Sequence, residues 1–98
     1  MIEIRTNCEN CNSPLPPNSE EAMICAFECT FCETCVKTIL QNVCPNCGGG
    51  FEKRPILPKN YLLKYPQSDK KIFKPIDTDK FQGMLLKFKD INPSERWF

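Results

Sequence analysis

The eight cysteines of this chain lie between residues 8 and 47, and their spacing constrains the fold more than any other feature. Three pairs have two residues between their members, and a fourth pair has three. Two thiolates at such a separation reach one metal ion through a tight backbone turn. Four pairs supply two complete sets of four thiolates, so the spacing predicts two metal sites. The pairs are Cys8/Cys11, Cys25/Cys29, Cys32/Cys35 and Cys44/Cys47.

Disulfides are the main alternative, because small secreted domains are often stapled by them. The N-terminal stretch MIEIRTNCENC lacks the basic start and the apolar run of a secretory signal. No apolar run approaches the roughly 20 residues that span a bilayer, so no membrane partner is expected. We therefore expect a cytoplasmic protein, and in a reducing cytoplasm clustered cysteines bind metal more often than they bind each other.

The spacing alone leaves open which pairs share an ion. Consecutive pairs can share one, or the pairs can interleave, with the first joining the third and the second joining the fourth. A third arrangement places residues 25, 29, 32 and 35 around one centre, as in an iron–sulfur cluster with four thiolate ligands. Cys29 and Cys32 are close enough for a single turn to place them side by side, which favours interleaving.

The segment CAFECTFC at residues 25–32 resembles the Cys-x3-Cys-x-aromatic-Cys signature of radical S-adenosylmethionine enzymes. Those enzymes resemble full or partial barrels of parallel strands and helices, and a complete barrel needs roughly 200 residues or more. A chain of 98 residues cannot build one. We therefore interpret this signature as a coincidence of spacing.

The spacing of all eight cysteines resembles that of RING fingers, in which eight ligands bind two zinc ions in a cross-brace. Cys29 stands where that family usually has histidine. Residues 1–55 also resemble a small bacterial family known only as a domain of unknown function (number 1272). The resembling segments are CENC (8–11), LPP (15–17), ICAFECTFCETC (24–35), CPNCGGGF (44–51) and RP (54–55).

This resemblance implies a RING-like zinc fold without an established activity. The cofactors implied are two Zn²⁺ ions, with an iron–sulfur cluster as the alternative. The first ion would be held by Cys8, Cys11, Cys32 and Cys35. The second ion would be held by Cys25, Cys29, Cys44 and Cys47.

Charge divides the chain into two unlike halves. Residues 1–50 carry two basic and six acidic side chains, a net charge of −4, whereas residues 51–98 carry eleven and six, a net charge of +5. The acidic half contains all the cysteines, which argues against the metal module itself binding a polyanion. Histidine is absent, so mixed cysteine–histidine zinc sites and histidine-based catalysis are excluded.

The fold class expected is a small, metal-stabilised α+β protein, because so short a module buries too little apolar surface to fold without a staple. Residues 1–5 and 22–27 alternate like short strands. Residues 33–43 predict a helix of about three turns. Gly48 permits the positive φ that metal-binding turns often require, and Asn10 and Asn46 tolerate it. The apolar stripe of the helix would be Val36, Ile39, Leu40 and Val43.

The predicted domains are a RING-like two-zinc module at residues 1–54 and a proline-rich basic extension at residues 55–98. The extension is expected to be mostly extended, with a helical turn or two at 59–65, and to end in an amphipathic helix at about 78–89 capped by Asp77 or Thr78. The apolar face of that helix is expected to pack on the module, with a homodimer as the alternative. That face consists of Phe81, Met84, Leu85 and Phe88.

We expect a protein that is not an enzyme, because four thiolates close a zinc shell and leave no position for water. The favoured function is a small adaptor whose partner is another protein. The alternatives are a ubiquitin-ligase-like RING protein, weak nucleic-acid binding through the basic and aromatic residues 53–74, and redox or zinc sensing by the bound thiolates. Nucleic acid is the less favoured partner, because the net charge is only +1.

Overall fold

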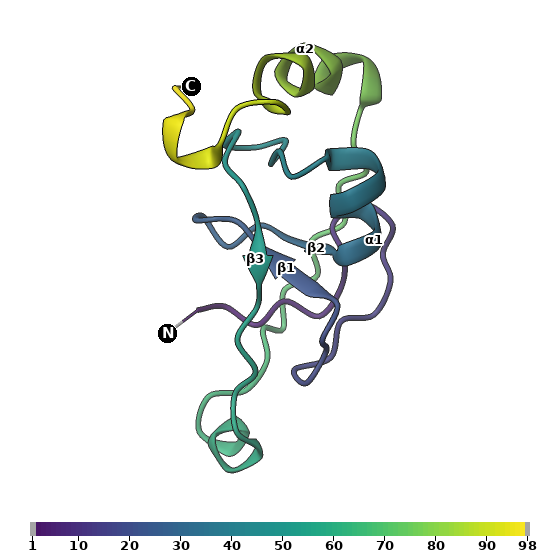
Figure 1. Cartoon of the computed structure of the whole chain (residues 1–98). Helices are drawn as coiled ribbons and strands as arrows, with labels where there is room; N and C mark the ends of the chain where they lie inside the picture. The colour runs from purple at the N-terminus through teal and green to yellow at the C-terminus, as the bar shows by residue number, and fades with distance from the viewer. Residues whose placement is uncertain (1, 98) are drawn as a thin grey trace.

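Three short strands form an antiparallel sheet in the middle of the molecule (Figure 1). They are β1 (Ala22–Ile24), β2 (Thr30–Cys32) and β3 (Glu52–Lys53). The computed structural model describes residues 2–97. β1 is the central strand, and Met23 on it lies opposite Phe31 of β2 and Lys53 of β3. The turn between β1 and β2 contains Cys25 and Cys29, so the sheet places these two cysteines at the end of this strand pair.

The helix after β2 is shorter than the three turns expected. It consists of α1 (Glu33–Cys35) and a π-helical turn, η1 (Val36–Leu40). Gln41 and Asn42 have positive φ values of 47° and 61° and end the helix. The side chain of Asn42 then accepts a hydrogen bond from the N–H of Phe51 at 2.8 Å. This contact closes the loop that contains the fourth cysteine pair, directly before β3.

The apolar stripe of this helix is only partly as predicted. Val36, Leu40 and Val43 are buried, whereas Ile39 is 38% exposed. The π-helical turn is closed by a hydrogen bond from the N–H of Gln41 to the carbonyl of Val36, five residues earlier. This wider turn changes the angular spacing of the side chains on which the prediction for Ile39 rested.

The strand predictions were also partly wrong. Residues 2–5 form no strand, and Met1 lies outside the described residues. Ile4 is buried, but its carbonyl accepts a single hydrogen bond from the N–H of Ser68 instead of joining a ladder. The strand expected at 22–27 ends at Ile24, where the turn that contains Cys25 and Cys29 begins, and β3 was not predicted.

The second half of the chain contains one α-helix and two short 3₁₀ helices. They are η2 (Lys59–Leu63), α2 (Thr78–Phe88) and η3 (Pro93–Glu95). The carboxylate of Asp77 caps α2 by accepting hydrogen bonds from the N–H groups of Asp79 and Lys80 at 3.1 and 3.3 Å. Asp77, rather than Thr78, is therefore the cap.

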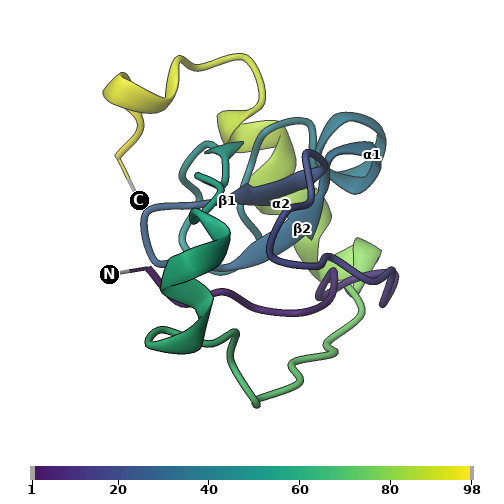
Figure 2. The same cartoon turned by 90° about the horizontal axis from the view of Figure 1, so that it is seen from below.

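α2 shares the core of the cysteine-rich half. Phe81, Leu85 and Phe88 are buried in the same cluster as Phe31 and the cysteines, and Met84 is partly buried against it. Figure 2 shows α2 passing behind the sheet when the molecule is seen from below. A homodimer through this face stays an untested alternative, and it would require these side chains to leave the core of their own chain.

Arg54, just after β3, fastens the N-terminal segment to the sheet. Its side chain is buried, and its guanidinium donates to the carbonyls of Arg5, Leu15 and Pro16 at 2.7, 3.2 and 2.9 Å. Burial lowers the pKa of Arg54. The loop that precedes β1 is thus held in place by hydrogen bonds from one buried cation.

Among the described residues, no helix is both long and apolar enough to cross a membrane.

Candidate metal centres

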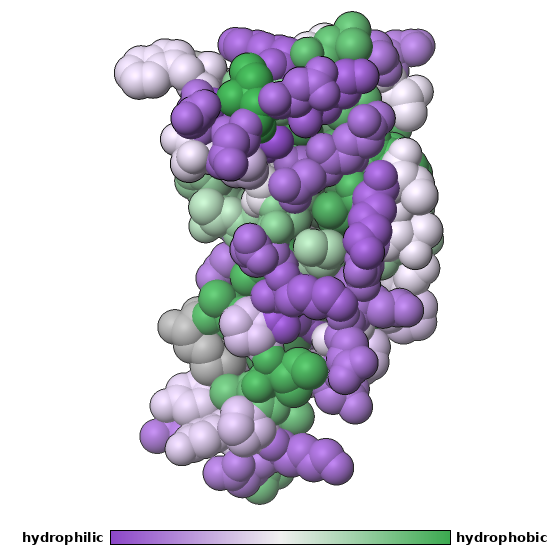
Figure 3. All heavy atoms as spheres, in the orientation of Figure 1, coloured by the Kyte–Doolittle hydropathy of each residue, from purple (hydrophilic) through white to green (hydrophobic). Residues whose placement is uncertain are grey.

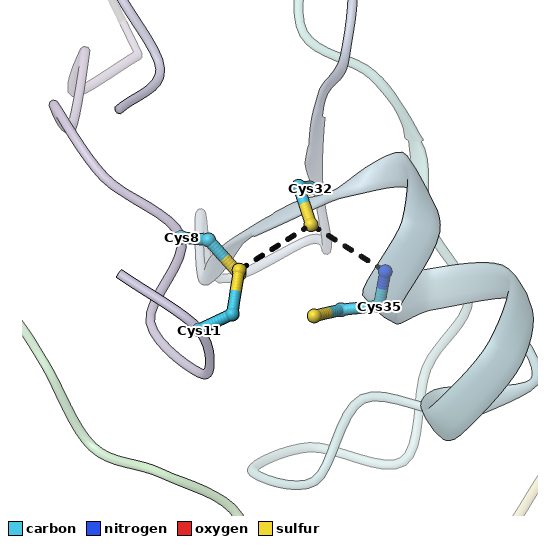
Figure 4. Close-up of side chains that lie close together, drawn as sticks. All are labelled: Cys8, Cys11, Cys32 and Cys35. Atoms are coloured by element: carbon cyan, nitrogen blue, oxygen red, sulfur yellow. Dashed lines mark hydrogen bonds between the residues drawn. The ribbon is translucent and has the colours of Figure 1, made fainter. Parts of the chain in front are cut away.

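Four of the predicted ligands come together at the N-terminal end of α1 (Figure 4). The sulfur atoms of Cys8, Cys11, Cys32 and Cys35 all lie within 4.8 Å of one another. The Cys11 and Cys32 sulfur atoms are 3.7 Å apart. A tetrahedral zinc ion with Zn–S bonds of about 2.3 Å separates its sulfur ligands by about 3.8 Å. The donor set of this first group therefore fits a four-coordinate zinc ion.

Polar groups surround the sulfur atoms of the first group. The N–H of Cys35 donates to the sulfur of Cys32 at 3.4 Å, so that Cys32 also caps α1. The amide of Asn10 donates to the sulfur of Cys35 at 3.4 Å. The hydroxyl of Ser13 lies 3.0 Å from the sulfur of Cys11. Donors around a thiolate stabilise its negative charge and orient it toward a metal.

The second group contains three cysteines, with the fourth beside them. The sulfur atoms of Cys25, Cys44 and Cys47 lie within 4.8 Å of one another, and Cys29 is outside that mutual limit. The thiol of Cys29 nevertheless forms hydrogen bonds with the thiols of Cys25 and Cys44. The amide of Asn46 donates to the Cys29 sulfur at 3.3 Å. The structure therefore places the eight cysteines in two clusters of four, with Cys29 beside the three sulfur atoms of the second group.

The Cys8–Cys11 and Cys44–Cys47 loops have the same backbone turn. The residues that follow them, Asn12 and Gly48, have φ values of 63° and 75°. The N–H of Asn12 donates to the carbonyl of Cys8 at 2.9 Å, and the N–H of Gly48 donates to the carbonyl of Cys44 at 2.8 Å. The positive φ predicted at Gly48 is confirmed.

Asn10 and Asn46 tolerate positive φ, but the structure does not use them in that conformation. Neither residue has it, and Asn12 does instead. The two asparagines donate to sulfur atoms of the other pair in their own cluster, Asn10 to Cys35 and Asn46 to Cys29. Sequence reasoning missed this role, and the only signal was that both occupy the position directly before the second cysteine of a Cys-x2-Cys motif.

Crowding makes the thiols unequal in acidity. Hydrogen bonds from Cys29 and Cys44 lower the pKa of Cys25 to about 3, and hydrogen bonds with Cys25 and Cys29 raise the pKa of Cys44. In the first group, burial raises the pKa of Cys35. Burial also acts to raise the pKa of Cys11, but hydrogen bonds from Ser13 outweigh it and lower that pKa to about 6. A divalent cation would favour the thiolate form of every cysteine in such a group.

A buried carboxylate connects the first Cys-x2-Cys loop to the sheet. Glu9 accepts hydrogen bonds from the N–H of Thr30 at 2.6 Å and from Arg5 at 2.9 Å. Its own N–H donates to the carbonyl of Thr30 at 3.0 Å. Burial raises the pKa of Glu9 against the effect of the Thr30 hydrogen bond. This contact positions the first cysteine pair beside Cys32, two residues after Thr30, and no local sequence pattern indicates it.

The fold and the two sulfur groups define a small, cysteine-rich α+β protein whose cysteines can hold metal ions. The chain belongs to the family described as protein of unknown function (DUF1272), whose model matches residues 1–57. The matched segment includes every cysteine, and the family predicted from the motifs is confirmed. An uncharacterised protein of Rhizobium meliloti (strain 1021) is 52% identical over 75 residues, which cover 76% of this chain and 89% of the relative. No solved structure matches the chain significantly.

Proposed function

We propose that the chain binds two zinc ions in a RING-like cross-brace and uses them as structural elements. One ion is held by Cys8, Cys11, Cys32 and Cys35, and the other by Cys25, Cys29, Cys44 and Cys47. The observation that carries this proposal is the interleaving of the two sulfur groups, in which the first and third pairs meet and the second pair meets the fourth.

Cys29 is the proposed fourth ligand of the second centre. In the first Cys-x2-Cys loop Asn10 donates to Cys35, which is a member of the first sulfur group. In the matching loop Asn46 makes the corresponding bond to Cys29. The same loop geometry thus selects Cys29 as the counterpart of Cys35. A fourth thiolate closes the shell, and a closed shell is typical of a structural zinc ion.

An arrangement with residues 25, 29, 32 and 35 around one iron–sulfur cluster is disfavoured by the same geometry. Cys32 and Cys35 lie with Cys8 and Cys11 instead of with Cys25. Two all-thiolate tetrahedral sites suit zinc, which has no geometric preference from its d electrons and accepts four sulfur ligands.

Double variants test the interleaved pairing directly. Removing two ligands of one centre should release one zinc ion per chain, whereas removing one ligand from each centre should release both. We expect Cys8→Ala/Cys32→Ala to retain about one zinc ion and Cys8→Ala/Cys25→Ala to retain about none. Consecutive pairing reverses this result, since it places Cys8 with Cys25 and separates Cys8 from Cys32. Zinc is counted by elemental analysis of the purified proteins.

The proposed biological role is that of a non-catalytic adaptor for another protein. A groove of about 370 Å³ lies between the Cys44–Cys47 loop and α2. Phe31, Ile76 and Met84 give it apolar walls, and its charged lining residues are Lys74, Lys80, Glu9 and Asp77. A partner segment that inserts an apolar side chain between groups of both charges is complementary to this surface. The zinc ions would keep the loop on one wall of the groove rigid.

Cross-linking in cell extract tests the adaptor role. The zinc-loaded protein, with a photoreactive group at Lys80, should cross-link to a partner protein. Met84→Glu places a charge in the groove and should abolish the cross-link, whereas Leu86→Glu, exposed on α2, should not. Equal cross-linking by both variants would exclude the groove as the binding surface.

A further inference from the structure

Residues 55–71, which we call the η2 lobe, form one end of the molecule. The lobe contains η2 and protrudes at the lower end of Figure 1, and it lies toward the viewer in Figure 2. The molecule is elongated, with extents of 42 × 25 × 18 Å, and α2 lies at the opposite end. No side chain of the lobe belongs to the hydrophobic core. Most of its side chains are exposed and therefore available for contact outside the chain.

The lobe exposes several apolar and aromatic side chains within ten consecutive residues. Leu63 is 94% exposed and Ile56 is 49% exposed. Tyr61 and Tyr65 are also exposed, with ring centroids 6.5 Å apart. One exposed leucine would be ordinary, but a group of exposed apolar residues marks a binding surface. Figure 3 shows hydrophobic residues beside strongly hydrophilic ones at this end of the molecule.

The charge of the lobe identifies the kind of surface that it fits. Residues 55–71 carry four lysines and one aspartate, a net charge of +3. Lys59, Lys64 and Lys71 form no ion pair with any residue in the described part of the chain. Because these charges are not compensated within the molecule, they remain available to an anionic ligand.

We propose that the η2 lobe binds the surface of a lipid bilayer that contains anionic lipids. Leu63 and Ile56 would enter the boundary of the acyl chains, the tyrosine rings would lie at the level of the headgroups, and the lysines would contact phosphates. No membrane partner was expected from the sequence, because no apolar run in it is long enough to span a bilayer. Peripheral binding requires only exposed apolar side chains and a positive surface.

Two other ligands fit the lobe less well. Nucleic acid would use the tyrosines and lysines, but the most exposed side chain is Leu63, which neither stacks on a base as an aromatic ring does nor contacts phosphate. A second copy of the chain would bring two surfaces with a charge of +3 together, and these would repel each other. A bilayer with anionic headgroups is complementary to the aliphatic, aromatic and basic side chains at once.

Sedimentation with vesicles tests this proposal on the full-length, zinc-loaded protein. It should bind vesicles of phosphatidylcholine with about one quarter phosphatidylglycerol, bind pure phosphatidylcholine poorly, and dissociate as the salt concentration rises. Lys59→Gln and Lys64→Gln should each lower the partition coefficient roughly five-fold, and Leu63→Gln about ten-fold. The controls Leu86→Gln and Lys89→Gln, which are exposed outside the lobe, should bind as the wild type does.

Tryptophan fluorescence identifies which end of the molecule touches the bilayer. Trp97 is the single tryptophan and is exposed outside the lobe, so its emission should not shift when anionic vesicles are added. Leu63→Trp in a Trp97→Phe background should shift to shorter wavelength. The proposal is overturned if that variant does not shift, or if the lobe variants sediment as the wild type does. It is also overturned if an oligothymidylate, measured by anisotropy, binds with the same lysine dependence and vesicles do not.

Discussion

Arg54 stabilises this fold in a way that its place in the sequence does not suggest. An arginine in a basic stretch suggests a solvated cation, yet its guanidinium is buried and bonded to three carbonyl groups. Those carbonyls belong to the N-terminal segment and to the loop before β1. If the arginine is removed, they lose their donors in a place that water reaches poorly, and an unsatisfied buried polar group is costly.

Arg54→Met should therefore lower the free energy of unfolding by about 3 kcal/mol. Its neighbour Lys53 provides the matched control, because it carries the same charge in an exposed ion pair with Glu33 at 3.0 Å. Lys53→Met should change stability by less than about 1 kcal/mol. Urea denaturation of the zinc-loaded proteins measures both. Equal effects of the two variants would show that the bonds of Arg54 contribute little.

At the scale of elements, the Cys8–Cys11 and Cys44–Cys47 loops have the same local structure. Each ends in a residue with positive φ and sends an asparagine amide to a sulfur atom of another pair. Polar groups that orient metal ligands typically change affinity 10- to 100-fold when they are removed. Each asparagine should therefore affect its own centre only.

Asn46→Ala should weaken zinc binding at the second centre by about ten-fold and leave the first centre unchanged, and Asn10→Ala should do the opposite. Competition with a colorimetric zinc chelator measures the two affinities. Asn60→Ala, in exposed η2, is the control and should change neither. If each asparagine variant weakened both centres equally, the one-to-one assignment would be wrong.

α2 contributes to stability through its buried face. Phe81 packs in the same cluster as Phe31 and the cysteines, and Leu86 on the same helix is exposed. Phe81→Ala should lower the free energy of unfolding by about 3 kcal/mol, whereas Leu86→Ala should change it by less than about 0.5 kcal/mol. Thermal unfolding followed by circular dichroism measures the difference. A Phe81→Ala protein as stable as the wild type would mean that α2 is not part of the cooperative core.

At the scale of the whole molecule, local patterns were predictable and long-range contacts were not. The cysteine pairs are close in sequence, so their spacing indicated two metal sites and the family. α2 has an apolar repeat and a capping residue, and it begins at Thr78 and ends within one residue of its predicted end. β3 has two residues and no alternation to detect. The bonds of Arg54, Asn10 and Asn46 join segments that are distant in sequence, which no local pattern reveals.

Two zinc ions would also explain how so small a cysteine-rich half folds. Its strands have two or three residues, and five of the twelve residues that it contributes to the core are cysteines. Structural zinc sites contribute on the order of 10–16 kcal/mol of apparent binding free energy. That contribution offsets much of the entropy lost when the loops become ordered.

Native mass spectrometry of protein expressed in a reducing cytosol tests the two-zinc proposal. We expect a colourless protein that carries two zinc ions per chain, with all eight cysteines free of disulfides, and that loses its circular dichroism signal when a chelator removes the zinc. A mass that corresponds to fewer than two metal ions, to disulfide-linked cysteines, or to iron with sulfide would contradict it.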